Sequence, residues 1–386
     1  MTFSHIRFLF FFVIGVSALQ TVFAGSRKCH DVGIQVSVQT KVAKLPHHLT
    51  KDSLYNYLGK TVENIINIPI KGTYTIRGTY CKSTVKNKNN NRLQFLVHGV
   101  LGSRHEWTGE DADGLKPYHG TNYSYVDYVT ERGYDTLAID RLGNGQSDKP
   151  DPVLNVQLPS QIETTKSVLD KVKQGRLGKK YQNIIYVGQS YGSMLGHGIA
   201  TKYPNVINAY ILNGWSNAVS NSSIPTLYDL NFFPAKVVNS KKYGQLPPGY
   251  LAPTTPKGFQ NIDYYHGDNN KHFDQGMADR ESGTLGTATI GELYTTVLNP
   301  IPATDYKGHV LVITGQYDAW FCSRDAIFDP GNCGLGSGSL PAKSKAAFPN
   351  ADYSYHIPHN TGHAIQFHYT QKQSFAKSLA WIDQVL

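Results

Sequence analysis

Long apolar runs are scarce in this chain of 386 residues. One run covers residues 8–16 near the N-terminus, and the polar residues Gln20 and Thr21 follow it closely. No other stretch is apolar over the roughly 20 residues that a membrane helix needs. The sequence therefore excludes a protein with several membrane spans.

Cysteine is also rare, since the chain has only four, and no two of them have the C-x2-C spacing of common zinc sites. His356, His359 and His363 have a spacing that resembles a metal site, but no paired acidic motif accompanies them. We therefore expect no metal ion and no other cofactor.

A basic stripe and a complete nucleotide-binding motif are missing as well. The net charge is +9, but the lysines and arginines are scattered over the chain, so we expect no nucleic-acid partner. Gly143 and Gly145 follow a predicted strand as in a dinucleotide motif, but Asp148 occupies the place of the third glycine. Dinucleotide binding is therefore not expected.

The N-terminus has the pattern of a secretory signal peptide. His5 and Arg7 precede the apolar run. Val22, Phe23 and Ala24 resemble the small-residue motif after which signal peptides are cleaved. This predicts a signal peptide over residues 1–24 and a secreted protein without stable membrane insertion, and a retained signal anchor is the alternative.

The features of the remaining chain are typical of an extracellular protein. An even number of cysteines outside the cytosol favours disulfides, with three possible connectivities. Because Cys322 and Cys333 are close in sequence, we expect them to close a local loop, and we expect the other two to tie together two N-terminal strands. The remaining pair is Cys29–Cys81.

Two sequons, at Asn122 and Asn221, indicate glycosylation of surface loops in a fungal or other eukaryotic protein.

Short strands alternate with helices along the chain, which predicts a mostly parallel sheet with helices on both faces. The expected strands cover residues 34–42, 73–80, 93–97, 134–139, 184–189, 206–212 and 310–313. The expected helices cover residues 158–172, 191–202 and 366–385.

One of these strand-to-helix junctions carries a serine between two glycines. The apolar run 184–187 leads into Gly188-Gln189-Ser190-Tyr191-Gly192, and a helical pattern follows. This is the arrangement of a nucleophile elbow, in which glycines two positions either side allow a sharp turn that presents the serine hydroxyl. An ordinary glycine-rich turn is the alternative.

Two further residues could complete a catalytic triad with Ser190. Asp318 follows the strand at 310–313, and His363 precedes the C-terminal helix. Taken singly, the aspartate could form a turn or cap a helix, and the histidine could be a polar loop residue. The chain order of serine, acid and histidine is nevertheless the order of α/β-hydrolases.

With four motifs in register, the chain resembles the AB hydrolase-1 group of α/β-hydrolases over roughly residues 93–212 and 308–386. The motifs are the loop at His98-Gly99, the loop from Asp140 to Ser147, the elbow, and the loop at Gly362-His363. The resemblance implies the α/β-hydrolase fold and a secreted serine hydrolase that acts on a carboxylic ester or lactone.

In such an enzyme His363 is the base for Ser190, and Asp318 orients the imidazole. The backbone N–H groups of Tyr191 and Val100 are expected to form the oxyanion hole, with Leu101 as an alternative to Val100. A serine at position 190 argues against dehalogenases and epoxide hydrolases of this fold, which use aspartate there.

Other activities of the same fold remain open. Prolyl aminopeptidases have Gly-Gly-Ser-Trp-Gly at the elbow, and Gln189 and Tyr191 depart from that pattern. Peptide or carbon–carbon bond hydrolysis, a haloperoxidase-like activity and a non-catalytic binding protein are the alternatives.

The resemblance implies a cap inserted after the sixth strand. The expected division is residues 25–214 and 306–386 for the core and residues 215–305 for the cap. The cap is rich in aromatic residues, most of which we expect to form its own small core. Because acidic residues are few near its centre, we expect a neutral ester with a short to medium acyl group or an aromatic portion as substrate.

Overall fold

The computed structural model of the chain describes residues 27–57, 60, 65–110, 117–217, 230–298, 301–322 and 332–386. The predicted signal peptide and the sequon at Asn221 lie outside the described residues. Asn122 lies within them and is exposed.

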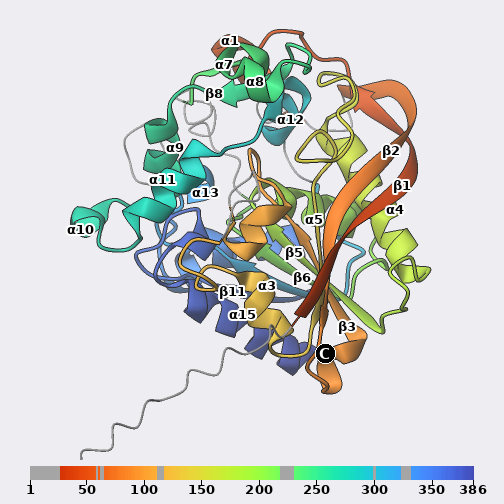
Figure 1. The fold of residues 1–386 in the computed structure, drawn as a ribbon, viewed down its shortest axis with the longest axis vertical. Coiled ribbons are helices and arrows are strands. Elements are labelled where there is room, and N and C mark those ends of the chain that lie inside the picture. The colour runs from red at the N-terminus through yellow and green to blue at the C-terminus, as the bar shows by residue number, and fades with distance from the viewer. Residues whose placement is uncertain are drawn as a thin grey trace, which may run out of the picture.

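An eight-stranded sheet crosses the centre of the molecule (Figure 1). Its strand order is β1-β2-β4-β3-β5-β6-β10-β11. Strand β2 is antiparallel to both of its neighbours, and all other neighbouring pairs are parallel. The strands are β1 (Arg27–Ala43), β2 (Ile66–Ser83), β3 (Arg92–Val97), β4 (Asp135–Ile139), β5 (Asn183–Gln189), β6 (Ala209–Asn213), β10 (His309–Ile313) and β11 (Asp352–His356). The predicted fold class, a mostly parallel α/β sheet, is confirmed.

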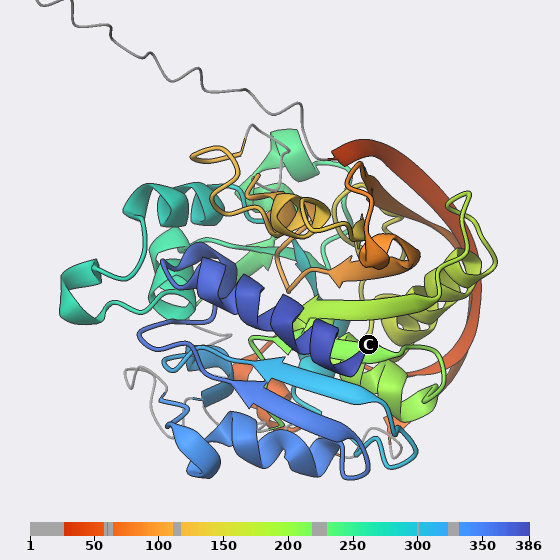
Figure 2. The ribbon, with the colours of Figure 1, turned by 90° about the horizontal axis from the view of Figure 1, so that it is seen from below.

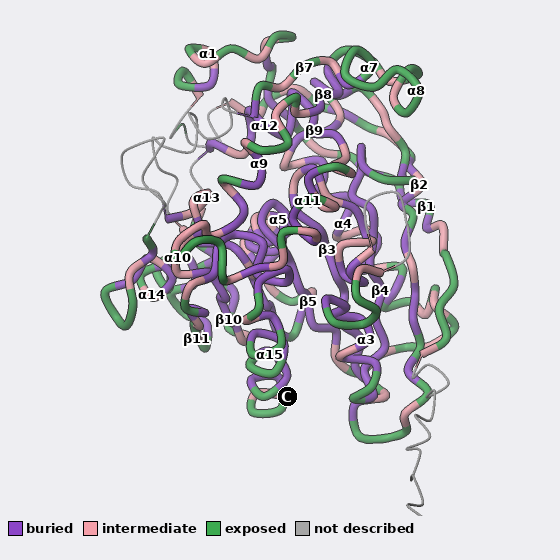
Figure 3. Tube along the Cα trace, turned by 60° about the vertical axis from the view of Figure 1, so that its left-hand side comes forward, coloured by how far each residue is buried: buried purple, intermediate pink, exposed green. Residues whose placement is uncertain are grey.

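Helices cover both faces of this sheet because the strands are apolar on both sides. In β5, Ile184 and Tyr186 pack in the cluster with α4 (Leu158–Lys173) and α5 (Tyr191–Lys202). Ile185 and Val187 point the other way, into the cluster with α3 and α15. Those two helices are α3 (Tyr125–Thr130) and α15 (Gln371–Val385). Figure 2 shows α15 lying along its face of the sheet, and Figure 3 shows the buried chain concentrated between the layers.

The described residues 230–298, between β6 and β10, form a separate group of elements, which we call the insertion. It carries a small antiparallel sheet in the order β7-β8-β9 and several short helices. In Figure 1 these elements lie above the central sheet. They are β7 (Phe232–Pro234), α7 (Ala235–Val238), α8 (Ser240–Tyr243), β8 (Tyr250–Pro253), α9 (Pro256–Asp263), α10 (Gly267–Asn270), α11 (Gln275–Gly283), β9 (Ala288–Thr289) and α12 (Ile290–Thr296).

Short helices complete the fold outside the insertion. They are α1 (Lys51–Tyr55), α13 (Ala319–Cys322) and α14 (Leu340–Lys343), together with the 3-10 turns Lys88–Asn91, Arg104–Thr108, Gly336–Gly338, Ser344–Ala347 and Ile365–Phe367. Among the described residues, none of the helices has both the length and the apolar character to cross a membrane.

Several elements differ from the sequence-based expectation: β1 and β2 extend beyond the expected residues 34–42 and 73–80, β6 begins at Ala209, and α3 was not predicted. The C-terminal helix was expected from residue 366 but begins at Gln371, because a 3-10 turn at Ile365–Phe367 precedes it. Strand β11 was not predicted, because none of the residues in Asp352–His356 is fully buried and the segment therefore has no apolar run. It is an edge strand that pairs only with β10.

Both expected disulfides are present. Cys29 and Cys81 join the paired strands β1 and β2, with a Cα–Cα distance of 4.0 Å. Cys322 and Cys333 lie 4.7 Å apart between their Cα atoms and are fully buried.

Candidate active site

Ser190 stands at the junction between β5 and α5, where the chain turns with φ 54° and ψ −117°. Such a positive φ is strained for a residue with a side chain. The flanking glycines are required by close backbone contacts: a Cβ on Gly188 would lie 2.6 Å from the carbonyl carbon of Gly192, and one on Gly192 would clash with the Val97 carbonyl oxygen. The glycines thus allow β5 to turn sharply and present Ser190 at the end of the strand.

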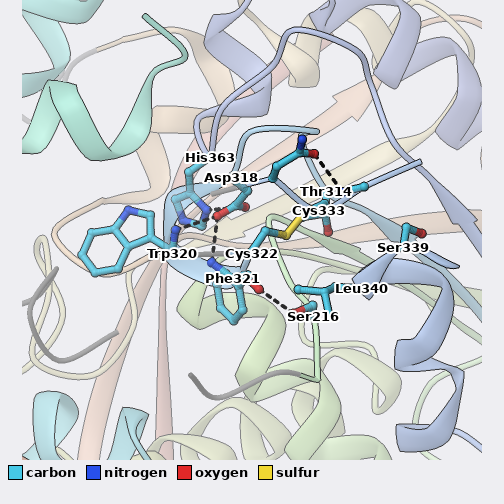
Figure 4. Close-up of a disulfide and its surroundings, with 12 residues drawn as sticks. Ser216, Thr314, Asp318, Trp320, Phe321, Cys322, Cys333, Ser339, Leu340 and His363 are labelled. Atoms are coloured by element: carbon cyan, nitrogen blue, oxygen red, sulfur yellow. Dashed lines mark hydrogen bonds and ion pairs between the residues drawn. A yellow bond between two sulfur atoms is a disulfide. The ribbon is translucent and has the colours of Figure 1, made fainter. Parts of the chain in front are cut away.

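His363 and Asp318 point toward each other, as Figure 4 shows, and His363 borders the same pocket as Ser190. The Nδ1 atom of His363 lies 2.8 Å from Oδ2 of Asp318, and both side chains are buried. The other carboxylate oxygen, Oδ1, accepts the backbone N–H groups of Trp320 at 2.9 Å and Phe321 at 3.0 Å. The start of α13 therefore fixes the carboxylate, and Oδ2 remains for the imidazole.

The backbone of His363 is held from the elbow itself. Gln189 donates from Nε2 to the His363 carbonyl oxygen at 3.0 Å. Gln189 is one of the two positions at which the elbow departs from the Gly-Gly-Ser-Trp-Gly pattern. Its amide therefore joins the loop of the histidine to the strand that ends at Ser190.

The electrostatic surroundings raise the pKa of His363 above its usual 6.5. Burial alone would lower this pKa, because it disfavours the imidazolium. The charge of Asp318 and its hydrogen bond favour the imidazolium and outweigh burial, with smaller contributions from Asp263 and Glu106. Such an imidazole is suited to accept a proton and to stay charged during a reaction.

The backbone that could bind an oxyanion lies against Ser190. A Cβ on Gly99 would be 3.1 Å from Ser190 Cβ, so the loop after β3 approaches the serine closely. In the described part of the chain, no hydrogen-bond partner takes the N–H of Val100 or of Tyr191. The alternative donor residue, Leu101, has a φ of 62° and is fully buried.

These groups border one pocket of about 660 Å³, including the open space at its mouth. Its floor contains Ser190, His363 and the loop from Gly99 to Ser103. Its walls come from the insertion and from the chain near α13. These wall residues are Phe259, Asp263, Met277, Arg280, Glu281, Thr284, Leu285 and Trp320.

The pocket is more acidic than the sequence suggested. Glu106 lies on the core side, and Asp263 and Glu281 come from the insertion. Burial raises the pKa of Glu106 to about 8 and that of Asp263 to about 6, and it raises that of Glu281 well above its usual value. The expectation that acidic residues are few near the centre of the insertion is therefore wrong, because α9 and α11 bring two carboxyl groups to the pocket.

The hydrogen bonds of these three carboxyl groups are incomplete or come from neutral donors. Trp320 donates from Nε1 to Asp263 Oδ1 at 2.6 Å, and Tyr264 donates its hydroxyl to Glu281. Glu106 Oε1 is enclosed and has no hydrogen-bond partner among the described residues. No sequence motif marks these residues, since Asp263 and Glu281 reach the pocket only through the fold of the insertion.

The histidines with metal-like spacing do not converge. His363 is engaged by Asp318, whereas His359 is exposed. Among the described residues, no group of three or more His, Cys, Asp or Glu side chains is arranged to hold a metal ion.

Comparisons with known proteins agree with this architecture. The sequence model of a family described as the alpha/beta hydrolase fold matches residues 95–368. A proline iminopeptidase from Chitinophaga pinensis is 29% identical over 187 residues, which is 48% of this chain and 50% of that protein. The matching part thus spans about half the length of this curated relative.

Solved structures resemble the chain over most of its length. A hydrolase from Pseudomonas aeruginosa has a TM-score of 0.50 and 17% identity, with 79% of this chain and 93% of that one covered. An esterase from Exiguobacterium antarcticum has a TM-score of 0.51 and 12% identity, with 80% and 95% covered. At such identities the likeness shows the fold alone.

Proposed function

The chain belongs to the α/β hydrolase fold family, and from that premise we propose that it is a secreted serine hydrolase that cleaves a carboxylic ester or lactone. Ser190 is the nucleophile, His363 the general base and Asp318 the residue that orients the base. The observation that carries the proposal is the 2.8 Å bond between His363 Nδ1 and Asp318 Oδ2 beside a serine held at positive φ. The bond occupies Nδ1 and leaves Nε2 for the serine hydroxyl.

The reaction proceeds through an acyl-enzyme. His363 Nε2 takes the proton of Ser190 while Oγ attacks the ester carbonyl carbon, and the carbonyl oxygen becomes an oxyanion. The N–H groups of Tyr191 and Val100 donate hydrogen bonds to that oxygen. The tetrahedral intermediate then collapses, the C–O bond to the alcohol breaks, and His363 gives its proton to the departing alcohol. A water molecule, deprotonated by the same imidazole, releases the acid and restores Ser190.

The lining of the pocket supports a small to medium substrate with an apolar portion. Phe259, Met277 and Leu285 offer apolar contacts from the insertion, which we propose acts as the cap that selects the substrate. The predicted signal peptide and the two disulfides support secretion.

The acidic pocket favours a second candidate, a peptide or amide substrate with a free amino group. Glu106, Asp263 and Glu281 face the same pocket as Ser190, and an ammonium group placed among them would offset the cost of burying their charge. The matching relative is a proline iminopeptidase, which is consistent with this candidate. The departures at Gln189 and Tyr191 from the aminopeptidase elbow weigh against it.

Labelling with a fluorophosphonate probe tests the proposal. Wild-type protein should gain one phosphonyl group, located at Ser190 by peptide mass spectrometry, and Ser190→Ala should gain none. Wild-type protein that stays unlabelled, or a label at another residue, would refute the proposal that Ser190 is the nucleophile of a serine hydrolase.

Substrate panels separate the two candidates. An esterase should hydrolyse p-nitrophenyl acetate or butyrate, with saturation below the micelle concentration of the ester. The amine candidate requires at least tenfold preference for an aminoacyl p-nitroanilide over its N-acetylated form, and Glu281→Gln should reduce that preference. Equal turnover of the free and blocked amides would reject the amine candidate.

A further inference from the structure

The carbonyl oxygen of Gly99 accepts three hydrogen bonds. His98 donates from Nδ1 at 2.8 Å, Arg141 donates from Nη2 at 3.0 Å, and the backbone N–H of Gly102 lies at 3.4 Å. Three donors on one carbonyl fix the direction of the whole peptide group that it belongs to. That peptide group joins Gly99 to Val100.

The direction of this peptide decides where the N–H of Val100 points. In a planar trans peptide the C=O and the N–H point to opposite sides. With the Gly99 carbonyl turned toward Arg141, the Val100 N–H is directed away from Arg141. Ser190 lies close to Gly99, since a Cβ on Gly99 would be 3.1 Å from Ser190 Cβ and 3.7 Å from Oγ.

His98 acts as a neutral donor in this arrangement. Its Nε2 accepts the backbone N–H of Arg141 at 3.1 Å, so the ring proton is on Nδ1 and is given to Gly99. Complete burial, together with the charge of Arg141, holds the pKa of His98 well below 6.5. The imidazole therefore keeps this tautomer over the neutral pH range.

The same guanidinium contacts the residue that carries the other proposed oxyanion donor. The Cζ atom of Arg141 lies 4.5 Å from the centre of the Tyr191 ring, in a cation–π arrangement. Both side chains are buried. Arg141 thus contacts both the side chain of Tyr191 and the carbonyl oxygen of Gly99.

The insertion supplies the counter-ion of this guanidinium. Arg141 Nη1 donates to Glu292 Oε1 and, at 2.8 Å, to Gln161 Oε1. The side chains of Arg141 and Glu292 are completely buried. The second oxygen of Glu292 accepts the backbone N–H of Thr289 at 2.9 Å, which caps α12. One carboxylate therefore joins the start of α12 to the guanidinium.

We propose that Arg141 is a positioning residue that aligns both donors of the oxyanion hole, and that Glu292 on the insertion holds it in place. The inference rests on the proposed function, because an oxyanion hole is needed only if Ser190 attacks an acyl or phosphonyl group. It also gives the insertion a part in catalysis that is separate from substrate selection. Breaking the Arg141–Glu292 pair should slow the chemical step without weakening substrate binding.

The second-order rate of fluorophosphonate labelling at Ser190 measures this effect without a known substrate. The phosphonyl oxygen occupies the oxyanion hole in the transition state, so misaligned donors lower the rate. Arg141→Lys keeps the charge but loses the planar fork that reaches Gly99 and Glu292 together. Glu292→Gln keeps the shape of the side chain and removes its charge.

Matched controls lie at the opposite end of the sheet. Arg92→Lys changes a buried arginine at the start of β3, which donates to Asn89 Oδ1 at 3.0 Å. Asp135→Asn changes a buried carboxylate at the start of β4, which accepts from the backbone N–H of Ser83 at 2.9 Å. Both controls should lose thermal stability and keep the labelling rate of the folded fraction.

The expected result is a labelling rate about tenfold or more below wild type in Arg141→Lys and in Glu292→Gln, measured on protein shown to be folded by circular dichroism. If an ester substrate is in hand, kcat should fall by a similar factor while KM changes less than about threefold. If Arg141→Lys does not fold, the rate in Glu292→Gln decides alone.

Three outcomes count against the inference or its premise. Labelling rates within twofold of wild type in the folded variants would overturn the positioning role, as would an equal loss in the controls. Wild-type protein that does not label at all would instead refute the proposed function itself. The two failures are therefore distinguishable.

Discussion

His363 Nδ1 lies 2.8 Å from Asp318 Oδ2, although the two residues are 45 positions apart in the chain. The strands β10 and β11 are parallel neighbours, so the loops that follow them meet at one edge of the sheet. The aspartate comes from the first loop and the histidine from the second. Because of this contact, the protonation of His363 should control the pH dependence of the activity.

The activity should depend on pH through His363. A base must be neutral to accept the serine proton, so activity is lost as the pH falls through its pKa. Because that pKa is raised by Asp318, Asp263 and Glu106 against the effect of burial, kcat/KM should reach half its maximum above pH 6.5. A pH–rate profile of ester hydrolysis measures the midpoint.

Asp263→Asn tests the electrostatic origin of this midpoint. The substitution removes a negative charge near His363 without touching the Asp318 bond, so the midpoint should move to lower pH. Glu131→Gln, on an exposed side chain, is the control and should leave the profile unchanged. An unshifted midpoint in Asp263→Asn would mean that the charge of Asp263 does not raise the pKa of His363.

Two substitutions of Ser190 separate catalysis from backbone strain. Ser190→Ala and Ser190→Gly should both lose several powers of ten in kcat, because the nucleophile is gone. Glycine normally destabilises a protein relative to alanine, but at φ 54° alanine keeps the strain and glycine relieves it. Ser190→Gly should therefore be more stable than Ser190→Ala by about 1 kcal/mol.

Thermal unfolding of the two inactive variants measures this order. The same pair of substitutions at Ser378, within α15, provides the control, since alanine should be the more stable there. A Ser190→Ala protein that is more stable than Ser190→Gly would argue against strain at the elbow. Ester turnover near the wild-type level in either variant would remove Ser190 from the mechanism.

The disulfide Cys322–Cys333 should support both stability and activity. Cys322 donates its backbone N–H to the Asp318 carbonyl at 3.0 Å, and Cys333 donates to the Gln316 carbonyl at 2.8 Å. The bridge therefore fixes the chain on both sides of the acid (Figure 4). A double substitution to serine should cost about 2–3 kcal/mol of unfolding free energy and lower kcat.

The second disulfide is the natural control for the first. Cys29–Cys81 joins β1 to β2, at a distance in sequence and in the sheet from the proposed triad. Its removal should lower stability and leave kcat close to wild type. If both double variants lose kcat equally, the bridge near Asp318 has no special role in positioning the acid.

Glu106 should make the protein less stable as the pH rises. Its pKa is about 8 in the folded protein, against 4.5 without burial, so folding favours the protonated form. The stability that this preference contributes is complete below pH 4.5 and is lost as the pH rises to about 8. Glu106→Gln, which imitates the protonated carboxyl group, should match wild type at pH 4 and exceed it at pH 8.

The gain at pH 8 should be on the order of 4 kcal/mol, because each pH unit between the two pKa values corresponds to about 1.4 kcal/mol. Chemical denaturation of both proteins at pH 4 and pH 8 measures it. Glu131→Gln should show no such difference between the two pH values. A Glu106→Gln protein that is equally stable at pH 8 would mean that the carboxylate is solvated in the folded state.

Much of the fold and the proposed triad could be predicted from the sequence because the signals are local. Apolar runs of a few residues predicted the strands that are buried on both faces, and the two glycines around Ser190 predicted the turn that their backbone contacts require. Asp318 followed from its place after the predicted strand at residues 310–313, and His363 followed from its place before the C-terminal helix and from the chain order of serine, acid and histidine. Edge strand β11 could not be predicted from the sequence, because a strand that is only partly buried needs no apolar run.

Only the tertiary structure decided which carboxyl groups line the pocket and which side chains hold the loop at Gly99 and Val100. Asp263 and Glu281 meet Glu106 because α9 and α11 of the insertion pack over the end of the sheet, and the sequence gives no period or motif for that packing. Arg141 and Glu292 are 151 positions apart and form a pair that is completely buried. Such contacts depend on how separate layers fit together, because burial and charge pairing are properties of the folded surroundings and not of the local chain.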